Sequence, residues 1–176
     1  MTEKIIILDF GSQVTQLIGR RLRELNVYCE IFPYNKCPEM DGSVKGVILS
    51  GSPCSVKDAN APSVNLDGIK GRIPVLGICY GAQYIAHRCG GKVEGSLARE
   101  YGRAMLGRIE ADCPLFKDIQ APAQVWMSHG DSITSLPDGY RATASTGSVR
   151  FAAFENREAS VWGVQFHPEV EHTLQG

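Results

Sequence analysis

The sequence predicts an α/β domain with a mostly parallel central sheet, layers of helices on its two faces and a small antiparallel extension. Three apolar runs, at Lys4 to Leu8, Val44 to Leu49 and Ile73 to Ile78, carry few charges, as strands buried on both faces do. A helical periodicity follows the first run. After Gly91 the pattern changes to short alternating stretches separated by turn residues, which is typical of antiparallel strands.

The first strand is predicted to lead into a helix. Lys4 to Leu8 is rich in isoleucine and ends in the polar turn Asp9 to Ser12, whose side chains can cap a helix. Beyond this turn, apolar residues recur at steps of three and four between charged ones, at Val14, Leu17, Ile18, Leu22 and Leu25. We therefore expect an amphipathic helix with one face on the sheet.

Length and pattern indicate a single domain over residues 1–176, because the chain has an ordinary domain size and shows no linker or repeat. The last residues, Glu171 to Gly176, form no predicted helix or strand that closes the fold. We therefore expect this domain to be the N-terminal part of a longer chain.

Composition excludes several functional classes. The formal net charge is -1, from 18 basic and 19 acidic residues, and no basic run is long enough for nucleic acid or a membrane surface. No stretch of 18 apolar residues predicts a membrane span. The six cysteines contain no CxxC pair, and the apolar start is too short for a signal peptide, so we expect reduced thiols in the cytoplasm.

The segment Gly77-Ile78-Cys79-Tyr80-Gly81 is the first candidate for catalysis. It follows a buried strand and precedes a predicted helix, as a nucleophile elbow does, and its glycines permit strained backbone. At a helix N-terminus the partial positive charge favours the thiolate of Cys79, and the N–H of Tyr80 could donate to an oxyanion. A buried cysteine that merely fills space has the same pattern, so a base must also be found.

Four histidines are available, and two of them are followed two residues later by a carboxylate. His87 lies eight residues beyond Cys79, roughly 12 Å along the predicted helix, which is too far for proton transfer. In His129-Gly130-Asp131 and His167-Pro168-Glu169, extended backbone would place acid and imidazole on one face. The pattern leaves both histidines open as the base.

Backbone context favours His167 over His129. His167 follows the apolar strand predicted at Val161 to Phe166, and Pro168 restricts the backbone after it. His129 precedes Gly130 in what we interpret as a looser turn. We therefore predict His167 as the base and Glu169 as the residue that orients it.

A metal site is not expected. The stretch His167 to His172 begins with HxE, but the PCxxC of the zinc deaminases does not follow, and HExxH is absent. Glu171 and His172 are expected to be solvated.

With Cys79 in GxCxG and His167 and Glu169 in HPE, the chain resembles the class I glutamine amidotransferases over essentially its whole length. Further stretches narrow the resemblance to the glutaminase domains of GMP synthetases. These are Leu8-Asp9-Phe10-Gly11-Ser12-Gln13, Arg99-Glu100-Tyr101-Gly102, Trp126-Met127-Ser128-His129-Gly130-Asp131 and Gly163-Val164-Gln165-Phe166-His167-Pro168-Glu169-Val170. The resemblance implies a flavodoxin-like, three-layer fold.

The resemblance also implies residue roles. Cys79 attacks the side-chain amide of glutamine, His167 passes the proton to leaving ammonia and then activates water, and Glu169 orients His167. A γ-glutamyl thioester connects the two half-reactions. The loop with His129 would hold the substrate backbone, and the substrate-binding residues implied are Gly51, Gln83, Ser128, Gly130 and Asp131.

The oxyanion hole is implied at Tyr80 and at the strand end Ser50-Gly51-Ser52-Pro53. Similar proteins usually have Gly-Gly-Pro here, so Ser52 replaces a glycine. A Cβ at this position penalises positive φ and would make a peptide flip harder by roughly 1 kcal/mol. We expect the hole to be either permanently formed or permanently misaligned in the isolated domain.

No cofactor is expected in this domain, because it has no SGGVDS-like loop, Walker A motif or GxGxxG. The resemblance implies an ATP pyrophosphatase or synthetase partner, as a fused domain or a separate subunit. This partner would bind ATP and Mg²⁺, adenylate XMP and receive the ammonia through a shielded path. The expected longer chain favours the fused arrangement.

Three alternative functions share some of these features. One is an amidotransferase component that serves another biosynthetic acceptor, against which the FGSQ and SHGD stretches argue. Another is a non-catalytic module of the same fold, which would be expected to lack Cys79, His167 or Glu169. The last is a DJ-1/PfpI-like cysteine hydrolase, whose histidine would lie near the elbow rather than in a late HPE.

Overall fold

The computed structural model describes residues 1–176, with the side chains of residues 97–99 excepted. Of the stretch from Arg99 to Gly102, the Arg99 side chain therefore lies outside the described part. In chain order the elements are β1 (Lys4–Asp9), α1 (Thr15–Glu24), β2 (Cys29–Pro33), η1 (Tyr34–Lys36), β3 (Val44–Leu49), η2 (Leu66–Gly68), β4 (Val75–Ile78), α2 (Tyr80–Arg88), β5 (Lys92–Leu106), β6 (Arg108–Ile109), η3 (Pro114–Phe116), β7 (Ala123–Ser135), β8 (Arg141–Ser145), β9 (Ala153–Asn156) and β10 (Val161–Val164).

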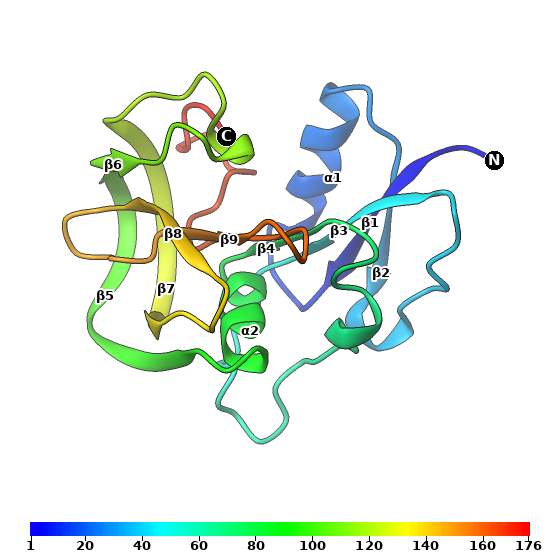
Figure 1. The fold of residues 1–176 in the computed structure, drawn as a ribbon, viewed down its shortest axis with the longest axis horizontal. Coiled ribbons are helices and arrows are strands. Elements are labelled where there is room, and N and C mark those ends of the chain that lie inside the picture. The colour runs from blue at the N-terminus through cyan, green and yellow to red at the C-terminus, as the bar shows by residue number, and fades with distance from the viewer.

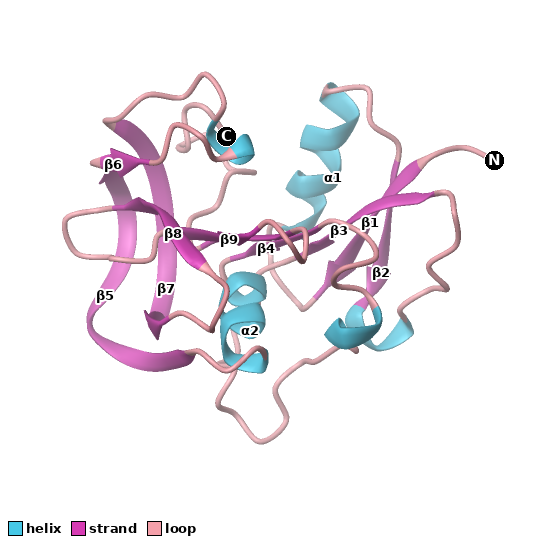
Figure 2. Ribbon diagram, viewed as in Figure 1, coloured by secondary structure: helices cyan, strands magenta, loops and turns pink.

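The central sheet has eight strands in the order β2-β1-β3-β4-β10-β9-β8-β6. The pairs from β2 through β10 are parallel, and the remaining pairs are antiparallel. This confirms the predicted parallel sheet with an antiparallel extension, but the antiparallel interpretation of the part after Gly91 was wrong for β10, which pairs in parallel with β4. Figure 2 shows the strands of the sheet running across the middle of the molecule.

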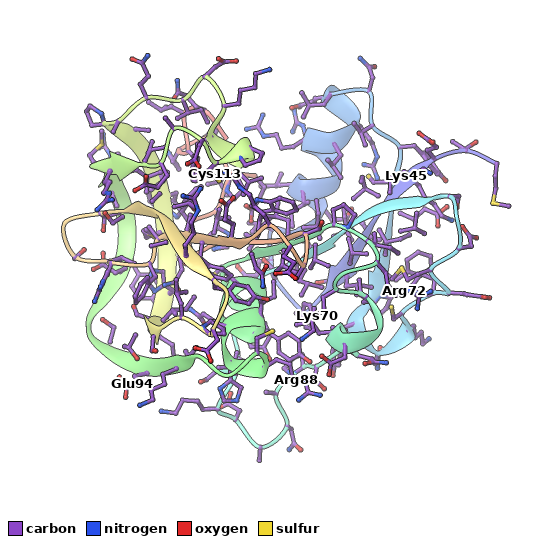
Figure 3. All side chains as sticks on the ribbon, viewed as in Figure 1. Lys45, Lys70, Arg72, Arg88, Glu94 and Cys113 are labelled. Carbon is purple, nitrogen blue, oxygen red and sulfur yellow. The ribbon has the colours of Figure 1, made fainter. Side chains whose placement is uncertain are left out.

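Helices α1 and α2 cover opposite faces of this sheet (Figure 1). Ile6 and Leu8 of β1 belong to the apolar cluster that includes Ile85 of α2, whereas Ile7 belongs to the cluster that includes Ile18 of α1. This alternation is the period-two pattern of a strand buried on both faces. The side chains drawn in Figure 3 fill the space between the helices and the sheet, and the three-layer prediction is confirmed.

Helix α1 begins and ends differently from the prediction. Its N-cap is Val14, without a side-chain cap; Ser12 Oγ instead accepts from Val14 N at 3.1 Å, and Asp9 Oδ1 accepts from Thr15 Oγ1 at 2.8 Å. Leu25 follows the last helical residue and is 72% exposed, so its assignment to the buried face was wrong.

Strands β5 and β7 form a separate two-stranded antiparallel sheet, seen at the left of Figure 1. The sequence predicted only short antiparallel strands after Gly91 and a loose turn at His129. That turn was wrong: β7 continues to Ser135, because β5 pairs along it and places Glu100 opposite His129. The glycine after His129 therefore does not end the strand.

Candidate active site

A cavity of about 730 Å³ lies beside the carboxyl end of β4, bounded on its far side by β7. This is where ligands bind in open α/β sheets. Seven of the ten predicted site residues line it: Ser52, Cys79, Gln83, Ser128, Gly130, Asp131 and His167. Glu169 is buried behind His167 at 3% exposure.

Cys79 occupies the strained turn between β4 and α2. Its φ of 53° and ψ of -107° are unusual for a side chain with a Cβ, as expected of a nucleophile elbow. Its N–H donates to Val164 O at 2.8 Å, and its carbonyl accepts from Gln83 N at 3.0 Å. The Sγ–H donates to Ser128 O at 3.5 Å, so the thiol points toward β7. The predicted elbow is thereby confirmed.

The glycines of the elbow permit the strained turn, as predicted, and the structure shows how. Neither Gly77 nor Gly81 has positive φ, so they permit the strained turn by their lack of a side chain and not by their own backbone angles. A Cβ on Gly81 would lie 2.3 Å from Leu49 O, and one on Gly77 would lie 2.6 Å from Ala82 N. The glycines allow β3, β4 and α2 to approach closely, and Cys79 itself carries the strain.

His167 and Glu169 form a buried pair in which Nδ1 of the imidazole donates to Oε1 at 2.6 Å. The predicted pairing is present, but it forms on the turn at Pro168 rather than on extended backbone. Arg21 Nε donates to the Glu169 carbonyl at 3.1 Å and ties this turn to α1. The predicted base, His167, and the residue predicted to orient it, Glu169, are therefore in direct contact.

His167 is the strongly perturbed titratable group of the site. Burial alone would lower its pKa, but hydrogen bonds and charge from Cys79 and Glu169 outweigh burial and raise the pKa to about 10. His167 therefore holds a proton at neutral pH, as an imidazolium between a sulfur and a carboxylate. Such a group can donate a proton to a leaving amine.

Thr173 joins the backbone of His167 to β7. Its buried hydroxyl donates to the His167 carbonyl at 2.6 Å and accepts from Trp126 N at 3.0 Å. His167 N in turn donates to Trp126 O at 2.9 Å. These three bonds fix the residue that carries the imidazole against the strand whose Ser128 carbonyl contacts Cys79.

We expect Thr173→Val to lower the catalytic rate of the Cys79 site about tenfold and to lower the free energy of unfolding by about 1 to 3 kcal/mol. Valine keeps the shape of threonine but leaves the Trp126 N–H and the His167 carbonyl without this buried partner. Steady-state kinetics and urea unfolding measure the two effects. Thr173→Ser keeps the hydroxyl and should restore most of the activity; equal loss in both variants would contradict a positioning role.

His129, the competing base candidate, has a different environment. Its Nδ1–H donates to the backbone carbonyl of Asp131 at 2.7 Å, while the Asp131 carboxylate accepts from Ser55 Oγ at 2.6 Å. Burial lowers the pKa of His129. Its Nε2 is buried without a partner among the described residues. His129 is therefore a neutral imidazole without an orienting carboxylate.

Two other predicted residues have clear packing roles. Gln83 Nε2 donates to Asp131 O at 3.0 Å and to Gln165 Oε1 at 3.2 Å, so it connects the elbow helix to β7. A Cβ on Gly51 would lie 3.4 Å from Cε1 of His167 and 3.7 Å from Cβ of Cys79. Gly51 therefore leaves room for the two reactive side chains to meet.

The two predicted oxyanion positions flank Cys79. Tyr80 is the first residue of α2, where a backbone N–H has no intrahelical acceptor. Its side chain donates to Pro62 O at 2.6 Å and is buried. Ser52 lines the cavity without positive φ, and its Oγ accepts from Cys54 N at 3.2 Å.

Sequence reasoning assigned no role to several residues that line the cavity. These are Ser12, Gln13, Ser55, Tyr101, Trp126 and Val170. Ser12 and Gln13 follow the carboxyl end of β1, a position that could have indicated them. Ser55 binds the Asp131 carboxylate across 76 residues of sequence, and no local pattern announces that contact.

Five further cysteines lie outside the elbow. All six cysteines are free, and Cys29, Cys79 and Cys113 are buried.

Wherever side chains are described, no group of three or more His, Cys, Asp or Glu side chains is arranged to hold a metal ion. The helices of the described chain also include none that is long and apolar enough to cross a membrane.

A mixed α/β sheet with a cysteine elbow and a buried His–Glu pair is the arrangement of an enzyme with a cysteine nucleophile, and the comparisons identify its family. Residues 6–176 match the family model of glutamine amidotransferase class-I. The chain belongs to this family.

Within this family, the chain is similar in sequence to GMP synthases. It is 59% identical over all 176 residues to the GMP synthase [glutamine-hydrolyzing] of Cytophaga hutchinsonii and 60% identical to that of Bacteroides fragilis. It spans only 35% of the length of each of these relatives. A solved structure from Thermoplasma acidophilum, provisionally described as one subunit of a GMP synthase, superposes with a TM-score of 0.88 at 32% identity. That match covers 99% of this chain and 88% of the other.

Proposed function

We propose that this chain hydrolyses glutamine to glutamate and ammonia and supplies the ammonia for the amination of XMP to GMP. The observation that carries the proposal is the buried Cys79–His167–Glu169 cluster, with its 2.6 Å imidazole–carboxylate bond, beside the cavity. The names of the relatives support GMP as the product.

In the proposed first half-reaction, Cys79 gives its thiol proton to solvent, and the thiolate Sγ then attacks the δ-carbon of glutamine and forms a carbon–sulfur bond. The backbone N–H of Tyr80, with a second donor at Ser52, stabilises the oxyanion. His167 gives its proton to the amide nitrogen as the carbon–nitrogen bond breaks, and ammonia leaves. Gln83, Ser128, Gly130 and Asp131, together with Gly51, are proposed to hold the substrate.

In the proposed second half-reaction, His167 accepts a proton from water as the water oxygen attacks the γ-glutamyl thioester. The carbon–sulfur bond breaks with its electron pair on sulfur, and glutamate leaves as its new carboxyl group gives a proton to solvent. The Cys79 thiolate and the His167 imidazolium are thereby restored. Glu169 keeps Nδ1 protonated throughout, so that the other ring nitrogen faces the reacting atoms. No metal or cofactor takes part in this proposed sequence.

The proposed partner is the synthetase part of such relatives, which would bind ATP and Mg²⁺ and adenylate XMP. Support comes from the 65% of each relative that lies outside the match with residues 1–176. We therefore propose that residues 1–176 are the glutaminase domain of a larger protein or complex. We place the reaction in the cytoplasm, where ATP and nucleotides are available.

The function is tested by replacing the matched third of the Cytophaga hutchinsonii GMP synthase with this chain and measuring glutamate and GMP. We expect one GMP for each glutamate released when XMP and ATP are present. A different acceptor would be favoured by the following result: the hybrid releases glutamate but forms no more GMP than a control without glutamine, while added ammonia still gives GMP. No glutamate release would contradict the proposed chemistry.

Ser52 provides a separate prediction. We expect Ser52→Gly to change the glutaminase rate of the isolated chain by about fivefold or more, because removing the Cβ eases a peptide flip by about 1 kcal/mol. Glutamate release by the isolated chain measures this. Ser55→Gly is the control for the loop in general, and an unchanged rate in Ser52→Gly would argue against the effect of the Cβ.

A further inference from the structure

The outward face of the β5–β7 sheet has an unusual composition. Cross-strand pairing places Tyr101 beside Ser128, Arg103 beside Trp126, and Met105 beside Gln124, and all six belong to the same face of this sheet. The alternate residues, including Met127 and Val125, are buried in the core. We refer to these six residues as the β5–β7 outer face.

An outward antiparallel face is usually polar, but this one presents large apolar side chains. Tyr101 is 64% exposed and Met105 is 47% exposed. The ring of Trp126 packs against that of His172 in a tilted arrangement, with centroids 4.7 Å apart, and stays partly exposed. Tyr, Trp, Met and Arg are the residues enriched in protein interfaces.

Arg103 adds an unpaired charge to this face. It is exposed, and it forms no ion pair or hydrogen bond with any side chain that the structure describes. A guanidinium between an exposed tyrosine and an exposed methionine suits a partner surface that presents a carboxylate within an apolar rim.

The β5–β7 outer face is continuous with the mouth of the cavity. Tyr101, Trp126 and Ser128 line the cavity, while Arg103 and Met105 continue the face away from it along β5. A protein that covers the mouth must therefore contact this face. Ammonia formed at Cys79 reaches solvent unless the mouth is covered.

We propose that the β5–β7 outer face is the docking surface for the ammonia-accepting synthetase, an inference that rests on the proposed function. The occupant follows from two observations: the face borders the cavity where ammonia would form, and the relatives carry about two-thirds of their length outside this domain. A carboxylate of the synthetase pairs with Arg103, and an apolar surface receives Met105.

Strand β7 also connects this face to the catalytic base. The Trp126 backbone accepts from His167 N at 2.9 Å and donates to Thr173, which binds the His167 carbonyl. A partner seated on Trp126 therefore contacts the strand that holds His167 in place.

The test uses the same hybrid with the Cytophaga hutchinsonii protein and the double variant Arg103→Glu/Met105→Glu. Neither residue lines the cavity, so basal glutamate release should stay within twofold of the parent. Glutamine-driven GMP formation per glutamate released should fall at least about tenfold, while GMP formation from added ammonia stays unchanged. The matched control is Arg23→Glu/Leu25→Glu, which makes the same chemical changes on exposed residues around the end of α1.

Retention of the parent ratio of GMP to glutamate in the Arg103→Glu/Met105→Glu variant would overturn the proposal. An equal fall in the control would overturn it as well, because the effect would not be specific to this face. If the isolated chain self-associates, and the Arg103→Glu/Met105→Glu variant abolishes this self-association without changing the GMP-to-glutamate ratio, the β5–β7 outer face binds a second copy of the chain instead. Absence of glutamate release by the parent would refute the proposed function, an outcome distinct from loss of coupling in the variant.

Discussion

Cys79→Ala is expected to lower kcat for glutamate release by about ten-thousand-fold or more, the scale seen when a nucleophile is removed from a cooperating triad. The sulfur of Cys79 is the atom that would form the thioester, and no other described cysteine lies beside His167. Glutamate release by a coupled assay gives the rate. Mass spectrometry of the chain quenched with glutamine should show the γ-glutamyl adduct in the parent and not in the variant.

Cys29→Ala is the matched control for this prediction. Cys29 and Cys79 are both 5% exposed, and the thiol of each donates weakly to a backbone carbonyl, at 3.7 Å to Gly19 O for Cys29 and 3.5 Å to Ser128 O for Cys79. Loss of a buried thiol at Cys29 should cost stability but leave the glutaminase rate nearly unchanged. Comparable losses of activity in both variants would mean that Cys79→Ala acts through the fold.

The layered fold was predictable because its signal lies in short-range patterns. Strands such as Val44 to Leu49 are mostly apolar because both faces of the sheet are covered, and the elbow at Cys79 lies between a strand and a helix. The pairing of His167 with Glu169 was predictable for a similar reason, since two residues of sequence fix which side chains can meet. The geometry that allows it, a turn at Pro168, was not.

Features that depend on distant partners could not be read from the sequence. The length of β7 depends on pairing with β5, and the role of Thr173 depends on Trp126, 47 residues away. The glycine at 81 is required by the Leu49 carbonyl, which approaches from another strand. Local propensity carries no information about such contacts, which appear only when the chain is folded.

The two histidine candidates are expected to separate clearly when each is replaced by alanine. His167→Ala should lower kcat by about a thousandfold or more, because it removes the group that we propose protonates leaving ammonia and activates water. His129→Ala should still form the thioester, because its imidazole is neutral and has no carboxylate partner. Quenched mass spectrometry and glutamate release distinguish the two. Thioester formation in His167→Ala but not in His129→Ala would reverse the assignment.

The pH profile provides an independent check on His167. Because Cys79 and Glu169 raise the pKa of His167 to about 10, the proton needed by leaving ammonia is present below that pH and lost above it. The glutaminase rate should therefore fall as pH rises through about 10 in the parent and in His129→Ala. Glu169→Gln removes a charge that raises this pKa, so the fall should move to lower pH. A fall that stays in place in Glu169→Gln would mean that another group donates the proton.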